Sequence, residues 1–195
     1  WLKQKSEMYQ CVSIASLIIR ENNNFFNRMV AVFPDGELEY YDKQHLFSMA
    51  GEDKVFTSGD KSKIIEYKGW KIKLQICFDL RFPEGARNRI DESGKPEYDL
   101  LVYNANWPKR RIAHWDILLP ARAIENQCYF LASAQGGMHQ NQRQTWGQSM
   151  LIDPWGQIMQ ELATGEGFVI GQIHQETLEG VRSKLPALKH RKLSS

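Results

Sequence analysis

The sequence predicts one domain of mixed α and β structure, in which two β-sheets pack together and helices cover them from outside. Segments with the pattern of strands outnumber those with the pattern of helices. Residues 99–107 are a continuous apolar run of strand length, typical of a strand buried on both faces. Residues 70–78 alternate and then become wholly apolar, as in a strand that enters a core. Strands of this kind need a packed layer on each side.

The N-terminal part predicts a helix followed by antiparallel strands. Two apolar segments are separated by three consecutive asparagines, which is a turn signal. A second turn signal, Pro34-Asp35-Gly36, precedes another extended piece. In order, we expect a helix over residues 1–9, strands over 11–21 and 26–33, and an extended segment over 37–43.

The middle of the chain predicts a hairpin, a buried strand and a long helix. Apolar residues recur at helical spacing over residues 111–126, and Pro120 is expected to interrupt and kink that helix. In order, we expect strands over 63–67 and 70–78 around a turn at Lys68-Gly69, a surface loop over 91–98, the buried strand over 99–107, and the helix over 111–126.

The C-terminal part predicts further strands and a closing helix. In order, we expect a strand over 129–135, a polar loop over 136–146, a hairpin over 149–162 that turns at 153–156, a strand over 167–173, a helix over 176–185, and a loose basic tail over 189–195.

Composition places the chain among ordinary globular proteins. It is 42% hydrophobic and 25% charged, with a formal net charge of +2, so charge gives no argument for a nucleic-acid or membrane partner. The chain has no apolar run approaching the ~20 residues that span a bilayer and no secretory signal at its start. Its cysteines, Cys11, Cys77 and Cys128, are scattered and form no C-x-x-C pair. We therefore predict free thiols in a cytoplasmic protein.

Cys77 stands where an apolar strand ends and a dense cluster of charge begins. A structural cysteine would more naturally lie inside the apolar run. Strand ends are where active sites of open α/β sheets lie, and a helix that opens near Pro83, together with nearby cations, would lower the pKa of the thiol. The pattern favours a reactive thiolate over a buried core cysteine.

Lys43 and His45 are candidate partners of that thiol. Lys43 lies in an amphipathic stretch, where a lysine can stabilise an oxyanion, although a solvated lysine gives the same pattern. His45 could act as a base for Cys77, or be a hydrogen-bonded structural histidine. By itself, Glu52 in its loop carries no signal.

Polar residues also follow the second buried strand. Asn104, Asn106 and Trp107 come at its end and predict the wall of a pocket at the mouth of the sheet. Arg122 and Glu125 interrupt an apolar helix face, and we expect them to form a buried ion pair or hydrogen-bond network.

Five stretches in sequence order resemble the successive signatures of the nitrilase superfamily, the carbon–nitrogen hydrolases. They are most similar to its omega-amidase branch, which includes the bacterial 2-oxoglutaramate amidases. The resemblance runs from Tyr40 to Met159 and covers nearly the whole chain. The stretches are YYDKQHLF, LQICFDLRFPE, YNANWP, LPARAIENQCYF and MLIDPWGQIM.

This resemblance implies an α+β fold, a four-layer αββα sandwich that pairs as a homodimer through helices. It implies that Cys77 is the nucleophile and that Lys43 shares an oxyanion hole with the backbone N–H of Phe78. It matches Glu52 to a second glutamate beside the lysine, and it makes His45 a structural neighbour.

The implied reaction is hydrolysis of a small primary amide, such as 2-oxoglutaramate, to acid and ammonia through a cysteine thioester, with no metal or other cofactor. Arg81 would bind a substrate carboxylate, with structural pairing to Asp79 or Glu84 as the open alternative. Asn106 and Trp107 would line the substrate pocket.

One element of the family pattern is missing. The general-base glutamate of the family lies in an L-P-E-x-F-x-x-G stretch ahead of the lysine, and the glutamates before Lys43 have no such context. The chain also starts at Trp1, inside a predicted helix. We expect residues 1–195 to be a single carbon–nitrogen hydrolase domain that lacks its N-terminal strand and helix. The alternatives are an inactive dimeric scaffold and a Cys–His thiol hydrolase that uses Cys77 and His45.

Overall fold

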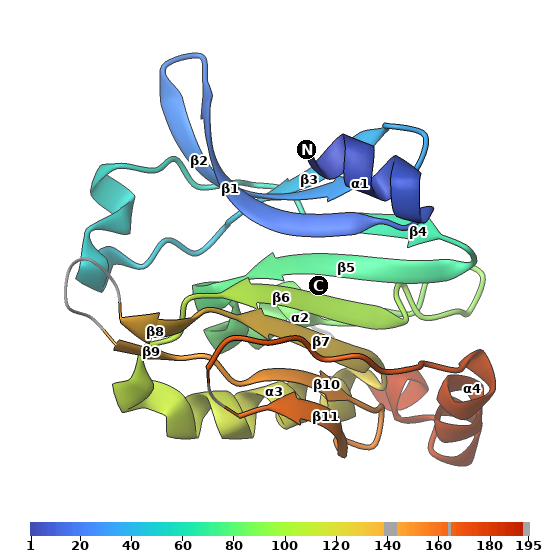
Figure 1. The fold of residues 1–195 in the computed structure, drawn as a ribbon. Helices are drawn as coiled ribbons and strands as arrows, with labels where there is room; N and C mark the ends of the chain where they lie inside the picture. The colour runs from blue at the N-terminus through green and yellow to red at the C-terminus, as the bar shows by residue number, and fades with distance from the viewer. Residues whose placement is uncertain (139–143, 164, 193–195) are drawn as a thin grey trace.

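The computed structural model describes residues 1–138, 144–163 and 165–192, and its N-terminal part is a small antiparallel sheet with a helix beside it (Figure 1). The Ser6 hydroxyl donates to the Val32 carbonyl at 3.0 Å, which fastens the helix to the sheet. Asn22 and Asn23 adopt positive φ in the first hairpin, as the asparagine turn predicts. The elements are α1 (Leu2–Tyr9), β1 (Ser13–Glu21), β2 (Asn24–Val32) and β3 (Leu38–Asp42).

A six-stranded mixed sheet forms the centre of the molecule, in the order β11-β10-β7-β6-β5-β4. The three central strands β5, β6 and β7 are parallel, and the flanking pairs are antiparallel. Parallel strands need crossover connections, which here include α2 (Pro83–Ala86) and α3 (Ile112–Asn126). The strands are β4 (Ile64–Tyr67), β5 (Trp70–Ile76), β6 (Leu100–Ala105), β7 (Tyr129–Ala134), β10 (Ser149–Ile152) and β11 (Ile158–Leu162).

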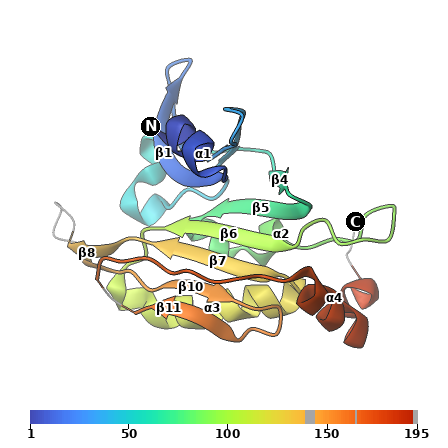
Figure 2. The same ribbon diagram turned by 45° about the vertical axis from the view of Figure 1, so that its right-hand side comes forward.

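Strand β6 is buried on both faces and separates two apolar interiors. Leu101 and Tyr103 pack on the side of α3, together with Trp115 and Leu119. Leu100 and Val102 pack on the opposite side, in a cluster that includes residues of β2 such as Met29. The layers therefore run from α1 through the two sheets to α2 and α3, as the two ribbon views show (Figures 1 and 2). This confirms the predicted mixed α and β, four-layer αββα arrangement.

The C-terminal helix α4 (Gln175–Lys184) anchors the end of the chain to the six-stranded sheet. Arg182 pairs with Asp99 at 2.7 Å and also donates to the carbonyls of Tyr98 and Gln127. A 3₁₀ helix over Ala187–His190 follows.

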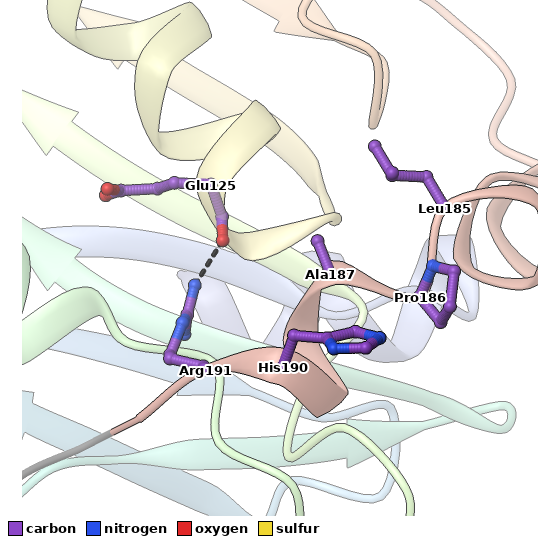
Figure 3. Close-up of a pocket in the computed structure, with 6 residues that line it drawn as sticks. All are labelled: Glu125, Leu185, Pro186, Ala187, His190 and Arg191. Atoms are coloured by element: carbon purple, nitrogen blue, oxygen red, sulfur yellow. Dashed lines mark hydrogen bonds between the residues drawn. The ribbon is translucent and has the colours of Figure 1, made fainter.

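The tail predicted to be loose is docked over its described residues. The guanidinium of Arg191 donates to the backbone carbonyl of Glu125 (Figure 3). It also donates to the backbone carbonyl of Asn88. Leu188 is buried. Residues 193–195 of the predicted tail lie outside the described residues. The prediction is wrong for residues 189–191 because charge alone does not show which carbonyls an arginine can reach.

The predicted strand over residues 167–173 is wrong. This segment has no strand partner among the described residues, and Phe168 and Ile170 are 82% and 74% exposed. It crosses the six-stranded sheet on the way to α4 (Figure 1), with Gly171 against Leu151 of β10. A Cβ atom added at Gly171 would lie 2.3 Å from the Leu151 side chain, so the backbone lies on the sheet face instead of at its edge.

The predicted loop over residues 136–146 instead contains a short hairpin, β8 (Gly136–Met138) paired with β9 (Gln144–Trp146). Residues 139–143 of that prediction lie outside the described residues. Pro120 lies inside α3, which continues on both sides of it, so the predicted interruption is wrong. The other predicted helices and strands are confirmed with small shifts of their ends. Among the described helices, none has the length and apolar character needed to cross a membrane.

Truncation of Leu119 should destabilise the fold strongly, because this fully buried side chain joins α3 to the central sheet. Leu119→Ala should lower the free energy of unfolding by about 2–5 kcal/mol, the usual cost of a large-to-small change in a core. Ile170, in the segment before α4, is 74% exposed, so Ile170→Ala should change the free energy of unfolding by less than about 0.5 kcal/mol. Urea titration followed by circular dichroism measures both, and equal losses would contradict the layer assignment.

Candidate active site

The carboxyl ends of the three parallel strands meet at one edge of the central sheet. Cys77 follows β5 directly, and Asn104 in β6 is paired with Ile76 on one side and Ser133 on the other. A cleft of about 800 Å³ opens at this edge, between the two sheets, and Cys77, Lys43 and Glu52 all line it. The structure therefore brings together the predicted nucleophile, lysine and glutamate, which are separated by 34 and 25 positions in sequence (77 − 43 and 77 − 52).

The backbone at Cys77 is strained. Its φ is +45°, in the left-handed region that a residue with a Cβ rarely adopts. Such a conformation costs of order 1–3 kcal/mol and persists where the surroundings impose it, often at functional sites. Here the extended strand β5 changes at Cys77 into a 3₁₀ helix over Cys77–Arg81. This sharp turn places the sulfur in the cleft.

The thiol of Cys77 is in surroundings that favour its neutral form. Burial raises its pKa above the ordinary value, and the carboxylates of Glu52 and Asp79 add to this, while the Lys43 ammonium and a backbone hydrogen bond of Asn106 lower it. The Cys77 Sγ atom also lies 3.9 Å from the carbonyl oxygen of Asn106. The predicted lowering of the thiol pKa is therefore wrong. Desolvation at the bottom of the cleft outweighs the single nearby ammonium group.

Lys43 and Glu52 form a buried ion pair. The Nζ atom of Lys43 lies 2.5 Å from Glu52 Oε2, and the lysine side chain is 3% exposed. Glu52 also accepts from the Phe47 N–H at 2.6 Å and from Asn27 Nδ2 at 2.9 Å. Burial alone would raise the pKa of Glu52, but these hydrogen bonds, that of Lys43 foremost, lower it below its ordinary value. The lysine is thus held in place by a carboxylate that stays ionised.

Asp79 is a fully buried carboxylate that sequence reasoning passed over as a site residue. It accepts from Tyr41 at 2.9 Å and from the N–H groups of His45 and Ile76 at 2.9 and 3.0 Å. Tyr41 and His45 flank Lys43 in sequence, and Ile76 precedes Cys77. One carboxylate therefore fixes the lysine segment to the cysteine turn. The signal that could have found it is an acidic residue three positions after the end of the buried strand β5.

His45 lies behind the cysteine turn and is not among the residues that line the cleft. Its Nδ1 atom is 2.8 Å from Asp79 Oδ1, and its ring stacks on Phe82 with centroids 3.9 Å apart. These contacts favour the structural interpretation of this histidine over the Cys–His pair.

A narrow recess of about 50 Å³ adjoins Cys77 on the side of α3, and it contains the other predicted binding residues: Phe78, Arg81, Asn106 and Trp107 all line it. Phe78 is the second residue of the 3₁₀ helix, a position whose N–H has no acceptor within the helix.

Arg81 does not pair with Asp79 or Glu84, the two structural partners considered for it. Its Nη2 atom lies 2.9 Å from His114 Nδ1, and its guanidinium carbon lies 5.0 Å from the Trp107 ring centroid. The oxygens of Asp79 are occupied by other donors. The predicted pairing of Arg81 with Asp79 or Glu84 is therefore wrong.

The predicted pair of Arg122 and Glu125 lies away from Cys77. The two side chains form an ion pair at 2.9 Å, with Arg122 buried and Glu125 partly exposed. A shallow hollow near the end of α3 is lined by Glu125 and by residues 185–187, 190 and 191 (Figure 3). Since α3 begins near the carboxyl edge of the sheet and ends at the opposite edge, this hollow is remote from the cysteine.

Comparisons with known proteins agree with this fold. Residues 1–183 match the family model described as carbon–nitrogen hydrolase. The chain is 38% identical to omega-amidase YafV of Yersinia enterocolitica and 33% identical to 2-oxoglutaramate amidase of Bacillus subtilis. These matches cover 96% and 95% of this chain, and 71% of each relative.

Solved structures give the same result. XC1258 from Xanthomonas campestris, described as a CN-hydrolase superfamily protein with an arsenic adduct in the active site, superimposes with a TM-score of 0.96 at 36% identity. The match covers all of this chain and 74% of that one. Nit3 of Saccharomyces cerevisiae, a nitrilase superfamily member, gives 0.87 at 25% identity, covering 98% of this chain and 70% of that one.

The fold and the similar proteins define an enzyme class, the hydrolases of carbon–nitrogen bonds in amides. The chain belongs to the carbon–nitrogen hydrolase family, within the nitrilase superfamily.

Acid should remove the contribution of Glu52 to stability. Its folded pKa lies below the ordinary value of 4.5, so its ionised form stabilises the fold above that value and the contribution is lost as pH falls through the folded pKa. The free energies of unfolding of the wild type and Glu52→Gln should differ most near about pH 7 and converge in acid. The control is Glu66→Gln, at an exposed carboxylate of β4, which should match the wild type at about pH 7. A difference for Glu52→Gln that stays constant with pH would contradict the lowered pKa.

Alkylation of Cys77 should require alkaline pH. Its pKa is raised above 9.0, and removal of the Lys43 cation should raise it further. Lys43→Met should therefore shift the pH profile of iodoacetamide modification upward, and Lys43→Met with Glu52→Gln should shift it back, since both charges are then absent. Mass spectrometry of the Cys77 peptide separates this reaction from that of exposed Cys11. A downward shift for Lys43→Met would show that the ammonium does not stabilise the thiolate.

Proposed function

We propose that this protein hydrolyses the omega-amide of a small dicarboxylic acid, such as 2-oxoglutaramate, with Cys77 as nucleophile. The observation that carries the proposal is the placement of Cys77, on a strained turn in a cleft that it shares with the buried Lys43–Glu52 pair. Two of the relatives above are an omega-amidase and a 2-oxoglutaramate amidase, which supports the substrate class.

The reaction proceeds through a thioester. The Cys77 thiol loses its proton to a carboxylate base, and the sulfur attacks the amide carbonyl carbon, whose oxygen becomes an oxyanion. The carbon–nitrogen bond then breaks, and nitrogen leaves as ammonia after taking the proton from the base. Water, deprotonated by the same base, attacks the thioester and releases the acid and the free thiol. Every group in this cycle returns to its starting state.

The Lys43 ammonium and the Phe78 N–H stabilise the oxyanion. Both groups flank the cysteine, one from the end of β3 and one from the 3₁₀ helix. Fixed donors in a water-poor cleft stabilise developing charge more than mobile solvent does. The Lys43 ammonium also stabilises the thiolate of Cys77. Because burial raises the pKa of this thiol, a thiolate formed in the cleft depends on that cation.

Glu52 acts by orienting the lysine and not by taking the thiol proton. Its carboxylate already accepts from Lys43, Phe47 and Asn27, and its pKa is lowered. A general base needs a pKa nearer to the working pH. In the family pattern that base is a glutamate in an L-P-E-x-F-x-x-G stretch, and the glutamates ahead of Lys43 do not lie in such a stretch.

The proposed substrate places its free carboxylate toward Arg81. A guanidinium binds a carboxylate through parallel hydrogen bonds, and Arg81 lines the recess next to Cys77, with Trp107 and Asn106 as its walls. We also propose that the protein acts as a homodimer that pairs through helices. Helix α3 supports this, since Ile117 and Ile124 are 68% and 53% exposed on it.

Replacement of the nucleophile tests the proposal directly. In the full-length protein, Cys77→Ala should reduce ammonia release from 2-oxoglutaramate to roughly a thousandth or less, while the circular dichroism spectrum stays unchanged. Lys43→Arg should reduce kcat by about 100-fold or more, because a planar guanidinium cannot occupy the position of the ammonium at the oxyanion. Substantial activity in Cys77→Ala would refute the assignment, and full activity in Lys43→Arg would refute the oxyanion role.

His45→Ala is the matched comparison. It removes a side chain that contacts Asp79 and Phe82. Under the proposal, its loss of kcat should be much smaller than that of Lys43→Arg. The opposite order would support the Cys–His alternative.

A further inference from the structure

Two guanidinium groups lie beside Cys77 without a carboxylate partner. Arg81 and Arg111 both line the recess of about 50 Å³ that adjoins the cysteine. Both are half-buried, yet neither forms an ion pair with an Asp or Glu anywhere in the described part of the chain. Lys109 and Arg110, the cations next to Arg111 in sequence, are exposed to solvent. Half-buried cations that line one recess favour a bound anion between them.

Aromatic rings hold the two guanidinium groups in place. Arg81 lies over the ring of Trp107 at 5.0 Å, and Arg111 lies over the ring of Phe47 at 5.1 Å. The Trp107 indole N–H also donates to the Arg111 carbonyl at 2.8 Å, so one tryptophan contacts both arginines. The two charges act on each other: burial lowers the pKa of Arg81, and the Arg111 cation lowers it further. An anion bound in the recess would relieve this repulsion.

His114 fixes the direction of Arg81. Arg81 Nη2 lies 2.9 Å from His114 Nδ1. Because a guanidinium only donates, Nδ1 is the acceptor and the ring proton lies on Nε2. His114 is in the first turn of α3 and is exposed, and it is not among the residues that line the recess. His114 therefore contacts Arg81 from outside the recess.

We propose that Arg81 and Arg111 together form an anion subsite next to Cys77, and that His114 is a positioning residue that holds Arg81 in it. The subsite takes the acid end of the amide substrate, so this inference rests on the proposed function. One guanidinium satisfies a carboxylate through two parallel hydrogen bonds. The second guanidinium group favours a substrate that has another oxygen acceptor beside the carboxylate, as in a 2-oxo acid.

Binding to an inactive variant tests the subsite separately from catalysis. In full-length Cys77→Ala protein, 2-oxoglutarate should bind more tightly than glutarate by calorimetry, and a further Arg111→Gln change should weaken 2-oxoglutarate binding about tenfold or more. Arg110→Gln is the control and should leave binding unchanged, since Arg110 is exposed and outside the recess. Unchanged binding in Arg111→Gln would overturn the two-arginine subsite. Equal binding of glutarate and 2-oxoglutarate would contradict the proposed preference for a ligand with a second oxygen acceptor beside its carboxylate.

Steady-state kinetics of the enzyme that retains Cys77 test the role of Arg111 during turnover. Arg111→Gln should raise KM for 2-oxoglutaramate about tenfold and leave kcat/KM for pentanamide, a neutral amide, unchanged. Equal loss for both amides would overturn the proposal. Inactivity of the parent enzyme on both amides would refute the proposed function, while the binding result above would still decide the subsite.

The role of His114 requires a rescue experiment. His114→Ala should raise KM for 2-oxoglutaramate several-fold and leave kcat unchanged. An increase of roughly this size is expected from the loss of one charge-assisted hydrogen bond. His114→Asn keeps an acceptor oxygen near the position of Nδ1 and should restore most of the lost affinity. An Asn variant as impaired as the Ala variant, or a loss confined to kcat, would overturn the positioning role.

Discussion

The carboxylate of Asp79 joins the two segments on which the candidate site depends. It is fully buried, and its oxygens accept from Tyr41, from the backbone of His45 and from the backbone of Ile76. The first two belong to the segment of Lys43, and the third precedes Cys77. A buried carboxylate without these donors would be very costly. The fold therefore holds the lysine segment and the cysteine turn in a single arrangement.

This fixed arrangement explains the electrostatics of the cleft. Cys77 is forced into a strained turn at the carboxyl edge of the sheet, where burial opposes its ionisation. Lys43 is the cation that acts against this burial, and Glu52 holds that cation in place through their ion pair. A cysteine whose charged form needs one oriented ammonium group fits a reaction in which negative charge appears on the sulfur and then on the substrate oxygen.

The same interior that stabilises the fold also shapes the binding side of the cleft. Trp107 contacts Arg81 with its face, donates to Arg111 with its indole nitrogen, and packs against Trp115 in the core. The first turn of α3 supplies His114, and its next turns supply Trp115 and Leu119 to that core. Changes in the packing of α3 are therefore expected to change substrate affinity, because the arginines are positioned by the helix and the tryptophan together.

The sequence by itself determined most of the strand and helix pattern and the buried character of β6, and its resemblance to a family singled out Cys77, Lys43 and Glu52 as candidate site residues. Apolar periodicity is a local property, and the family signatures are contiguous stretches, so both can be recognised without coordinates. The tertiary structure decided what depends on distant neighbours. It placed Asp79 between the lysine segment and the cysteine turn, paired Arg81 with His114, and raised the pKa of Cys77 where nearby cations had suggested the reverse. It also left residues 167–173 unpaired among the described strands, because a strand needs a neighbouring backbone that its own sequence cannot supply.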